Sequence, residues 1–154
     1  MRTFFIITAF IAATLSMLPE QVRADAGLVV KPSPYSVQVT MDRLEKILKE
    51  KGLSVALRLD HQANAARVNL KMLPSQILVF GNPKLGTPLM TSQPEVAIAL
   101  PLKALAWQDK NGKVWLGYTK PNVLASRFGI KDRQGVIKKM TGALNKLTNA
   151  ALKK

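Results

Sequence analysis

The chain contains no cysteine and only one histidine, His61, among its 154 residues. Without cysteine, disulfide scaffolds, thiol catalysis and cysteine-ligated zinc are excluded. A single histidine also excludes any metal site that needs two imidazoles from the same chain. We therefore expect no metal and no other cofactor.

Acidic residues are scarce, because 9 Asp and Glu stand against 23 Lys and Arg, for a formal net charge of +14. Paired carboxylates for glycoside hydrolysis are therefore disfavoured. Hydrophobic residues make up 47% of the chain, which is enough for a packed core and too much for a disordered protein. The length corresponds to a single domain.

The N-terminal residues predict export. Arg2 gives a basic start, residues 4–18 form an apolar run without charge, and Ala24 and Ala26 make a small-x-small cleavage pattern. The run is shorter than the ~20 residues that span a bilayer. We expect a signal peptide over residues 1–26 and a periplasmic or secreted protein, with a retained membrane anchor as the alternative. Because an exported protein meets little nucleic acid, we expect no nucleic-acid partner.

Hydrophobic periodicity and turn residues predict an α+β domain over residues 27–130, followed by a basic amphipathic helix over residues 131–154. The sheet should be mainly antiparallel, with helices packed on one face. Thr40 is the expected N-cap of the first helix. We expect strands at 28–30, 53–59, 76–80, 95–100, 104–108 and 113–118, and helices at 41–51, 62–70, 121–127 and from 133 onwards.

Residues 109–112 (DKNG) are a strong hairpin signal between two of the predicted strands. If Gly112 adopts the left-handed conformation of a bulged turn, Trp107 lies opposite Trp115. If the turn contains only two residues, Trp107 lies opposite Leu116 instead. The first register is favoured.

Residues 81–88 (GNPKLGTP) follow a predicted strand and form an expected loop. Their two glycines have the spacing of a phosphate loop, but the Lys and Ser/Thr needed after the second glycine are missing. Two prolines also remove backbone donors. A tight turn is therefore the leading interpretation. The alternative is a small anion site made by the glycine amides and Lys84.

His61 is the one side chain typical of acid–base chemistry near neutral pH, and it follows Asp60 at the end of a predicted strand. It is either a hydrogen-bonded structural histidine, which we favour, or the base of a hydrolase. No nucleophile-elbow motif surrounds a serine, which favours a protein that is not an enzyme. Cu(I) binding by His61 with Met41, Met72, Met90 and Met140 is disfavoured, because Met41 and Met140 lie on predicted apolar helix faces and are better explained as core residues.

Half of the net charge lies in residues 127–154, which hold eight Lys or Arg and one acid, Asp132, for a net +7. The same segment carries an apolar stripe at helical spacing. Such a helix can lie on an anionic membrane surface. Alternatively, its stripe packs on the sheet while the lysines face water, which we favour. The stripe consists of Val136, Met140, Ala143, Leu144, Leu147 and Ala151.

Several segments together form a recognisable signature. They are Asp60-His61, residues 74–90 with the run Phe80-Gly81-Asn82-Pro83-Lys84-x-Gly86-Thr87-Pro88-Leu89-Met90, Leu100-Pro101-Leu102-Lys103, Trp107-x-Asp109-x-x-Gly112-Lys113-Val114-Trp115 and Tyr118-x-x-Pro121. These segments resemble the bacterial domain of unknown function family 302, over about residues 37–129.

The resemblance implies a compact α+β fold that forms a dimer, with no established reaction. Family members often carry Arg-His-Gly near the end of the domain. Here Arg127-Phe128-Gly129 stands in that place, which argues against a site built from two histidines. The C-terminal helix lies beyond the resemblance, so we expect truncation after Ile130 to leave a folded domain.

The favoured hypothesis is an exported protein that binds a small anionic or apolar ligand, or acts as an accessory protein. His61 and residues 81–87 both follow predicted strands, so we expect them to line one pocket. The second hypothesis is an envelope-associated structural protein held to an anionic membrane by residues 131–154, and the third is a His61-dependent hydrolase. We also expect a homodimer. The candidate ligand-binding residues are His61, Gly81, Asn82, Lys84, Gly86, Thr87, Met90 and Tyr118.

Overall fold

The structure is a computed structural model that describes residues 27–154. The signal peptide expected at residues 1–26 lies outside the described residues. The elements follow in the order β1 (Leu28–Ser33), α1 (Val37–Glu50), β2 (Ser54–Asp60), α2 (His61–Arg67), β3 (Ser75–Gly81), α3 (Pro83–Ser92), the 3₁₀ helix η1 (Pro94–Ala99), β4 (Leu102–Gln108), β5 (Val114–Thr119), α4 (Pro121–Arg127) and α5 (Gln134–Leu152).

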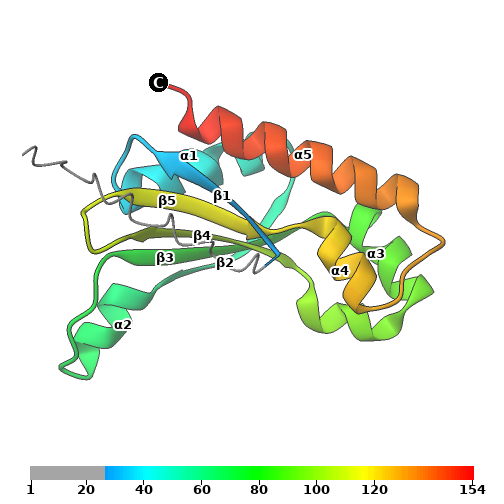
Figure 1. Cartoon of the computed structure of the whole chain (residues 1–154), viewed down its shortest axis with the longest axis horizontal. Helices are drawn as coiled ribbons and strands as arrows, with labels where there is room; N and C mark the ends of the chain where they lie inside the picture. Colours follow the sequence, from blue (N-terminus) through cyan, green and yellow to red (C-terminus); the bar gives the residue numbers. More distant parts are fainter. Residues whose placement is uncertain (1–26) are drawn as a thin grey trace, which may run out of the picture.

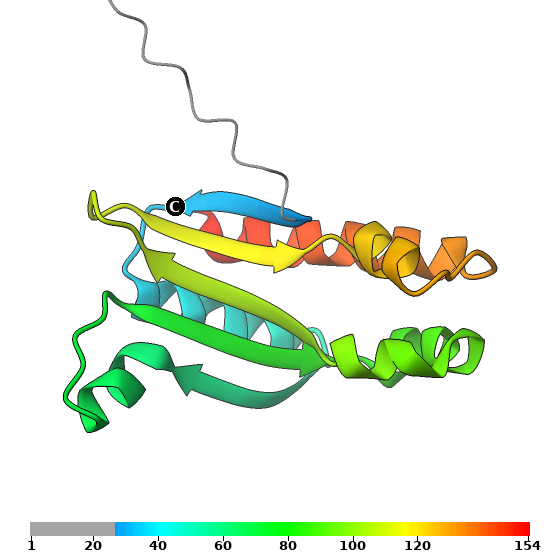
Figure 2. The same ribbon diagram turned by 60° about the horizontal axis from the view of Figure 1, so that its bottom comes forward.

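The strands form one sheet in the order β1-β5-β4-β3-β2, and every neighbouring pair is antiparallel. α1 and α5 lie on one face of this sheet (Figure 1). α3 and α4 lie beyond one end of the strands (Figure 2), and both contact α5. The expected α+β class, with an antiparallel sheet and helices on one face, is confirmed.

The main core lies between the sheet and the two helices α1 and α5. Successive strand residues point to opposite faces, so every second residue of β3 and β5 enters this layer. Phe80 and Leu116 are almost completely buried there. They pack with Met41 and Leu44 of α1 and with Leu144 of α5. The three-residue spacing of Met41 and Leu44 places both on one face of α1.

α1 begins earlier than predicted because Ser36, not Thr40, is its N-cap. The Ser36 hydroxyl oxygen accepts the Val39 N–H at 3.2 Å. Thr40 is buried, and its hydroxyl donates to the Ser36 carbonyl at 2.8 Å and contacts Ser33 Oγ at 2.6 Å. A threonine one turn into a helix can bond back to the preceding turn in this way. Gly52 follows the helix with φ +70°, as a terminating glycine does.

The β4–β5 hairpin has the favoured register, with Trp107 opposite Trp115. Gly112 has a φ of +79°, the left-handed conformation that the bulged turn requires. Asp109 holds the turn by accepting the Trp115 indole N–H at 2.8 Å and the Lys113 backbone N–H at 3.0 Å. The bond from Trp115 is the main reason why the pKa of Asp109 lies below its usual range.

Two predicted elements are wrong. Much of the expected loop at residues 81–88 belongs to α3, because Pro83 occupies the first turn, where a helix needs no N–H donor, and Asn82 caps the helix. Residues 95–100, expected as a strand, lie largely in η1 instead. Short apolar runs do not distinguish strands from buried helical turns. The sheet therefore has five strands instead of six.

The apolar stripe of α5 packs into the core, which confirms the favoured interpretation of this helix. Met140, Leu144, Leu147 and Ala151 are buried. The exposed side of the helix carries Lys138 and other lysines. No helix within residues 27–154 is long and apolar enough to cross a membrane.

Lys31 fastens the edge strand β1 to α5. Its ammonium donates to Asn145 Oδ1 at 2.7 Å, Thr148 Oγ1 at 2.8 Å and Asn149 Oδ1 at 2.6 Å. Partial burial among these uncharged acceptors lowers the pKa of Lys31. The neighbouring Pro32 is tolerated because β1 forms an edge of the sheet.

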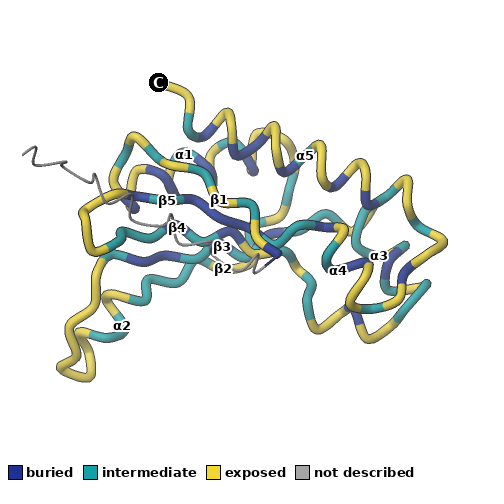
Figure 3. The backbone as a smooth tube through the Cα atoms, viewed as in Figure 1, coloured by how far each residue is buried: buried dark blue, intermediate teal, exposed yellow. Residues whose placement is uncertain are grey.

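The opposite face of the sheet remains largely open, and α2 projects from its edge on this side (Figure 1). Exposed residues follow α2 and the outer side of α5, whereas buried residues gather along the strands and inner helix faces (Figure 3). Several apolar side chains of the open face are exposed, including Leu28, Val30 and Leu57. The segment after α2 adds four further exposed apolar side chains, Val68, Leu70, Met72 and Leu73.

Candidate ligand cavity

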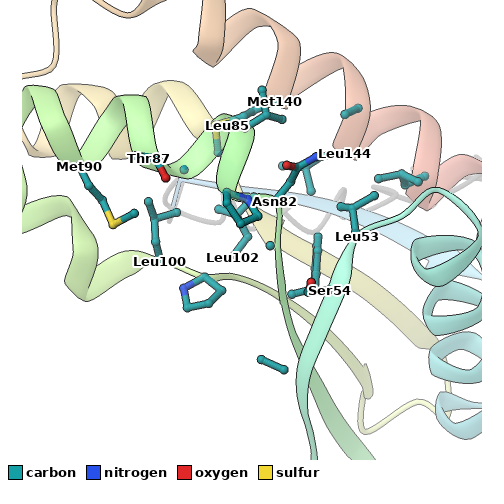
Figure 4. Close-up of a pocket in the computed structure, with 18 residues that line it drawn as sticks. Leu53, Ser54, Asn82, Leu85, Thr87, Met90, Leu100, Leu102, Met140 and Leu144 are labelled. Carbon is teal, nitrogen blue, oxygen red and sulfur yellow. The ribbon is translucent and has the colours of Figure 1, made fainter.

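A cavity of about 290 Å³ opens where β2 begins and β3 ends (Figure 4). Sites for small molecules typically measure ~300–1,000 Å³, so this cavity lies at their lower limit. Its walls come from the β2–β3 edge, α3, the segment before β4, and α5. It is lined by Leu53, Ser54, Ala56, Phe80, Gly81, Asn82, Pro83, Leu85, Gly86, Thr87, Met90, Leu100, Pro101, Leu102, Met140, Ala143, Leu144 and Leu147.

The end of β3 brings the walls together. Gly81 pairs with Ser54, so the last residue of β3 lies beside the first residue of β2. A Cβ on Gly81 would lie 3.4 Å from Pro101 Cβ, which leaves little room for a side chain between the strand and the segment before β4. Asn82 then starts α3 by accepting the Lys84 N–H at 2.9 Å.

α3 faces the cavity along one side of the helix, because Pro83, Gly86, Thr87 and Met90 are spaced by three or four residues. The missing side chain of Gly86 contributes to the open space. A Cβ there would meet only Leu100 Cδ1 at 3.8 Å and Met90 Cε at 4.0 Å, which are ordinary contacts. The cavity could therefore be narrowed at this point without displacing its walls.

The cavity is apolar inside and polar only at its rim. Phe80, Met140 and Leu144 are almost completely buried and form the inner wall. Ser54 and Thr87 supply exposed hydroxyl groups. The half-buried Asn82 side chain adds an amide, and no charged residue belongs to the lining. This arrangement suits a ligand with a large apolar part and a small polar end.

Five of the eight predicted site residues line this cavity: Gly81, Asn82, Gly86, Thr87 and Met90. Lys84 is exposed beside them, in the first turn of α3. Its own backbone N–H is bonded to the Asn82 side chain, so the amides of this turn are partly used in capping the helix. The loop-based anion site is therefore replaced by a helix that flanks an apolar cavity.

His61 does not lie near the cavity. It begins α2 directly after Asp60, the far end of β2, which lies six residues and about 20 Å from Ser54 along a strand that rises ~3.3 Å per residue. The expectation that His61 and residues 81–87 line one pocket is therefore wrong. Both segments follow strands, but β2 and β3 are antiparallel. The C-terminal ends of antiparallel neighbours lie at opposite ends of the sheet, measured along the strands.

Tyr118 is also separate from the cavity, because it is buried in the core on β5. Burial raises the pKa of its phenol, and a hydrogen bond with Thr148 opposes this shift. The cavity residues that the sequence did not indicate are mostly apolar, such as Leu53 and Met140. Their spacing is the same as that of core residues, so no signal in the pattern separates them from the core.

The opposite end of the sheet holds a second, polar cavity of about 260 Å³. Gln76, which is only 6% exposed, donates to Gln38 Oε1 and Asp60 Oδ2, both at 2.8 Å. Its own amide oxygen accepts Arg58 Nη2 at 2.7 Å. The Asp60 carboxylate also caps α2 by accepting the Ala63 N–H at 2.9 Å. These groups satisfy one another, and their arrangement stabilises the fold.

Within residues 27–154, no group of three or more His, Cys, Asp or Glu side chains could hold a metal ion.

Comparison with known proteins assigns a family. The family model "Domain of unknown function DUF302" matches residues 29–147. This range includes most of α5, so the expectation that the C-terminal helix lies beyond the family region is wrong. The crystal structure of an uncharacterized conserved DUF302 protein from Bacillus stearothermophilus has a TM-score of 0.66 and 23% identity. The match covers 82% of this chain and 96% of that protein, which shares the fold.

Two relatives have a described activity in their names. Proteins from Brucella suis and Brucella abortus, each named fluoride-specific ion channel FluC 1, are 41% identical to this chain over 106 residues. The match covers 69% of this chain but only 42% and 39% of those two proteins. The chain therefore spans about two fifths of the length of these relatives.

Proposed function

The chain belongs to the DUF302 family, a domain of unknown function, and from that premise we propose that it is an exported protein that binds a small, largely apolar ligand. The observation that supports this function is the open cavity with a hydrocarbon interior. Burying apolar surface is worth about 25 cal/mol per Å². A ligand that covers this interior removes its apolar surface from water, so its binding has a favourable free energy.

Ligand binding is tested with an uncharged fluorescent probe, N-phenyl-1-naphthylamine, added to the purified chain. We expect fluorescence to rise on binding and to be lost in Ala143→Leu, because Ala143 lines the cavity. Ala150→Leu is the matched control, since it makes the same change on an exposed position of α5. Equal binding by both variants would place the probe outside the cavity and contradict the proposal.

Export to the periplasm is supported by the sequence of residues 1–26. The mature chain would begin at Gly27, because Ala24 and Ala26 satisfy the small-residue requirement for cleavage. Intact-mass measurement of the protein from the periplasmic fraction tests this start. A protein that retains Met1 would contradict cleavage.

An accessory role beside an anion-transport protein is a second candidate, favoured by the Brucella relatives. Those proteins are named as fluoride channels, and the segment that matches this chain is 42% or 39% of their length. We infer that this chain supports a transport protein of the same kind. Deletion of its gene should then increase the sensitivity of growth to fluoride, and re-expression should restore growth. Unchanged sensitivity would contradict this role.

Association with the envelope is a third candidate and depends on the exposed side of α5. Lys138, Lys139 and Lys146 all face solvent there. Each such lysine is worth about 1 kcal/mol near an anionic bilayer. The triple change of these lysines to glutamine should reduce sedimentation with phosphatidylglycerol vesicles, and binding by the unchanged chain should weaken with salt. Negligible binding by the unchanged chain would rule this role out.

A homodimer through the open sheet face is the proposed assembly. This face and the segment after α2 expose apolar side chains, among them Leu57 (50% exposed) and Leu70 (65%). A second copy could cover both surfaces symmetrically. Light scattering should give the mass of a dimer for the unchanged protein and the mass of a monomer for Leu57→Lys. Val39→Lys, at 41% exposure on α1, is the control and should stay dimeric.

A further inference from the structure

We propose that the cavity takes a single-chain aliphatic carboxylate, with its tail along α5 and its carboxylate at the rim beside Asn82. This inference rests on the ligand-binding function proposed above and specifies the chemical class of the ligand. It follows from the shape of the cavity, the kind of side chains inside it, and the distribution of polar and charged groups around its rim.

The shape and lining of the interior favour a flexible chain. The wall supplied by α5 runs from Met140 to Leu147, which is about 10 Å at 1.5 Å per residue. Phe80 is the sole aromatic residue of the lining, and the remaining interior groups are aliphatic or thioether side chains. Methionine side chains such as Met90 adapt their shape to an irregular partner. A volume of about 290 Å³ favours one medium-length chain over a two-chain lipid.

The polar groups of the rim suit an acceptor. Asn82 uses its side-chain oxygen to accept the Lys84 N–H, so its amide presents N–H donors. Ser54 and Thr87 add hydroxyl groups on exposed positions of the same rim. A carboxylate is a pure acceptor that can use several such donors at once.

The charges next to the rim have one sign. Lys103 donates its ammonium to the carbonyl oxygen of Pro101, a rim residue, at 3.2 Å. Lys84 follows the rim residue Pro83 and is exposed. No carboxylate belongs to the lining, so a cationic head would find no opposite charge there. An anionic head would meet no like charge in the lining and is also attracted by the net charge of +14.

The experiment compares three amphiphiles of equal tail length below their micelle concentrations: decanoate, decanol and decyltrimethylammonium. Isothermal titration calorimetry with the purified chain should show the tightest binding for decanoate. The double variant Lys84→Gln/Lys103→Gln should weaken decanoate binding by up to about tenfold, as two partly exposed charge contacts allow, and leave decanol binding unchanged. Lys71→Gln/Lys138→Gln removes the same charge elsewhere and should not alter either affinity.

The location of the tail is tested with the cavity variants. Ala143→Leu should abolish decanoate binding and Ala150→Leu should preserve it, with circular dichroism as the check of the fold. If Ala143→Leu does not fold, Gly86→Ala narrows the same space and should weaken binding. Decanoate binding that survives both cavity changes would overturn the proposal.

The other outcomes separate this inference from the function on which it rests. Equal affinities for decanoate and decanol, with no effect of the rim lysines, would overturn the carboxylate assignment and leave the apolar ligand site intact. Tightest binding of decyltrimethylammonium would also overturn it. If none of the three amphiphiles binds, the proposed function and the inference both fail.

Discussion

The two ends of the sheet contain cavities of similar volume, about 290 and 260 Å³, with opposite chemistry. At one end, the walls are hydrocarbon and the polar groups are confined to the rim. At the other, Gln76 bonds to Gln38 of α1 and to Asp60 and Arg58 of β2. The volume of a cavity is therefore a poor guide to its role in this molecule.

The difference lies in whether the lining groups satisfy one another. A polar network whose members are all bonded stabilises the folded state and gains little from a ligand. Apolar groups cannot form hydrogen bonds with one another in this way. Their free energy falls only when their surface is removed from water, which a bound ligand can do. We therefore assign a structural role to the polar end of the sheet, and the proposed ligand binding belongs to the apolar end.

Removal of α5 has the largest expected effect, because this helix walls the apolar cavity and does not reach the polar one. Truncation after Ile130 deletes the buried Met140, Leu144 and Leu147. Losing one such side chain costs about 2–5 kcal/mol, while a domain has only about 5–15 kcal/mol in total. We expect circular dichroism to show no cooperative unfolding transition. A cooperative transition would restore the domain boundary at residue 130 expected from the sequence.

Gln76→Ala tests the structural role of the polar end. The change leaves Arg58 and Asp60 without their common partner, so the free energy of unfolding should fall by about 2 kcal/mol in urea titrations. Decanoate binding should not change. Gln62→Ala is the control, because Gln62 makes an exposed bond to the Met72 carbonyl; its effect should stay within about 0.5 kcal/mol. A loss of ligand affinity in Gln76→Ala would break the division of roles.

Gly86→Ala tests the apolar end with a small change. Alanine favours helix over glycine by up to about 1 kcal/mol, and its methyl group fits beside Leu100. The free energy of unfolding should therefore rise while ligand affinity falls. Gly142→Ala makes the same change where nothing lies within 4 Å, so it should raise stability by a similar amount without affecting affinity. If ligand affinity fell equally in Gly86→Ala and Gly142→Ala, the loss in Gly86→Ala would not come from narrowing of the cavity.

Acid has the smallest expected effect. Bonds from Lys49 and Arg58 lower the pKa of Glu45, and the bond from Trp115 lowers that of Asp109. A folded pKa below the unfolded value of about 4 contributes stability that is present above that value and is lost as pH falls. Urea midpoints should hold from pH 7 to 5 and decline below pH 4.

Asp109→Asn should reduce part of this acid dependence. Glu50→Gln, a change at an exposed carboxylate, is the control. If both variants keep the full decline of the unchanged protein, the Asp109 bond does not contribute to it.

Features decided by neighbouring residues could be predicted from the sequence. The turn at Gly112 sets the pairing of Trp107 with Trp115 through local geometry alone, and the structure has that register. The start of α3 was missed because glycine and proline favour loops on average. Pro83 stands in the first turn of α3, where a helix does not need its N–H. The position of this proline is therefore compatible with a helix, although proline and glycine are typical of loops.

Features decided by the order of strands could not be predicted in this way. His61 and Asn82 both follow strands, but β2 and β3 are antiparallel neighbours, so the two residues lie at opposite ends of the sheet along the strand direction. The cavity wall on α5 was equally hidden, because Leu144 contributes to the core and to the cavity at once. A periodic pattern shows that a side chain is turned inward and does not show what it meets there.

The bonds of Lys31 have a consequence for the order of folding. They join β1 to Thr148, 117 residues later in the chain, and β1 has β5 as its only neighbour in the described sheet. Contacts of such long sequence separation slow folding, because the loop between them must close first. The core is therefore completed only when the last helix is available. Until then Lys31 and the inward-facing residues of the sheet lack the partners that α5 provides.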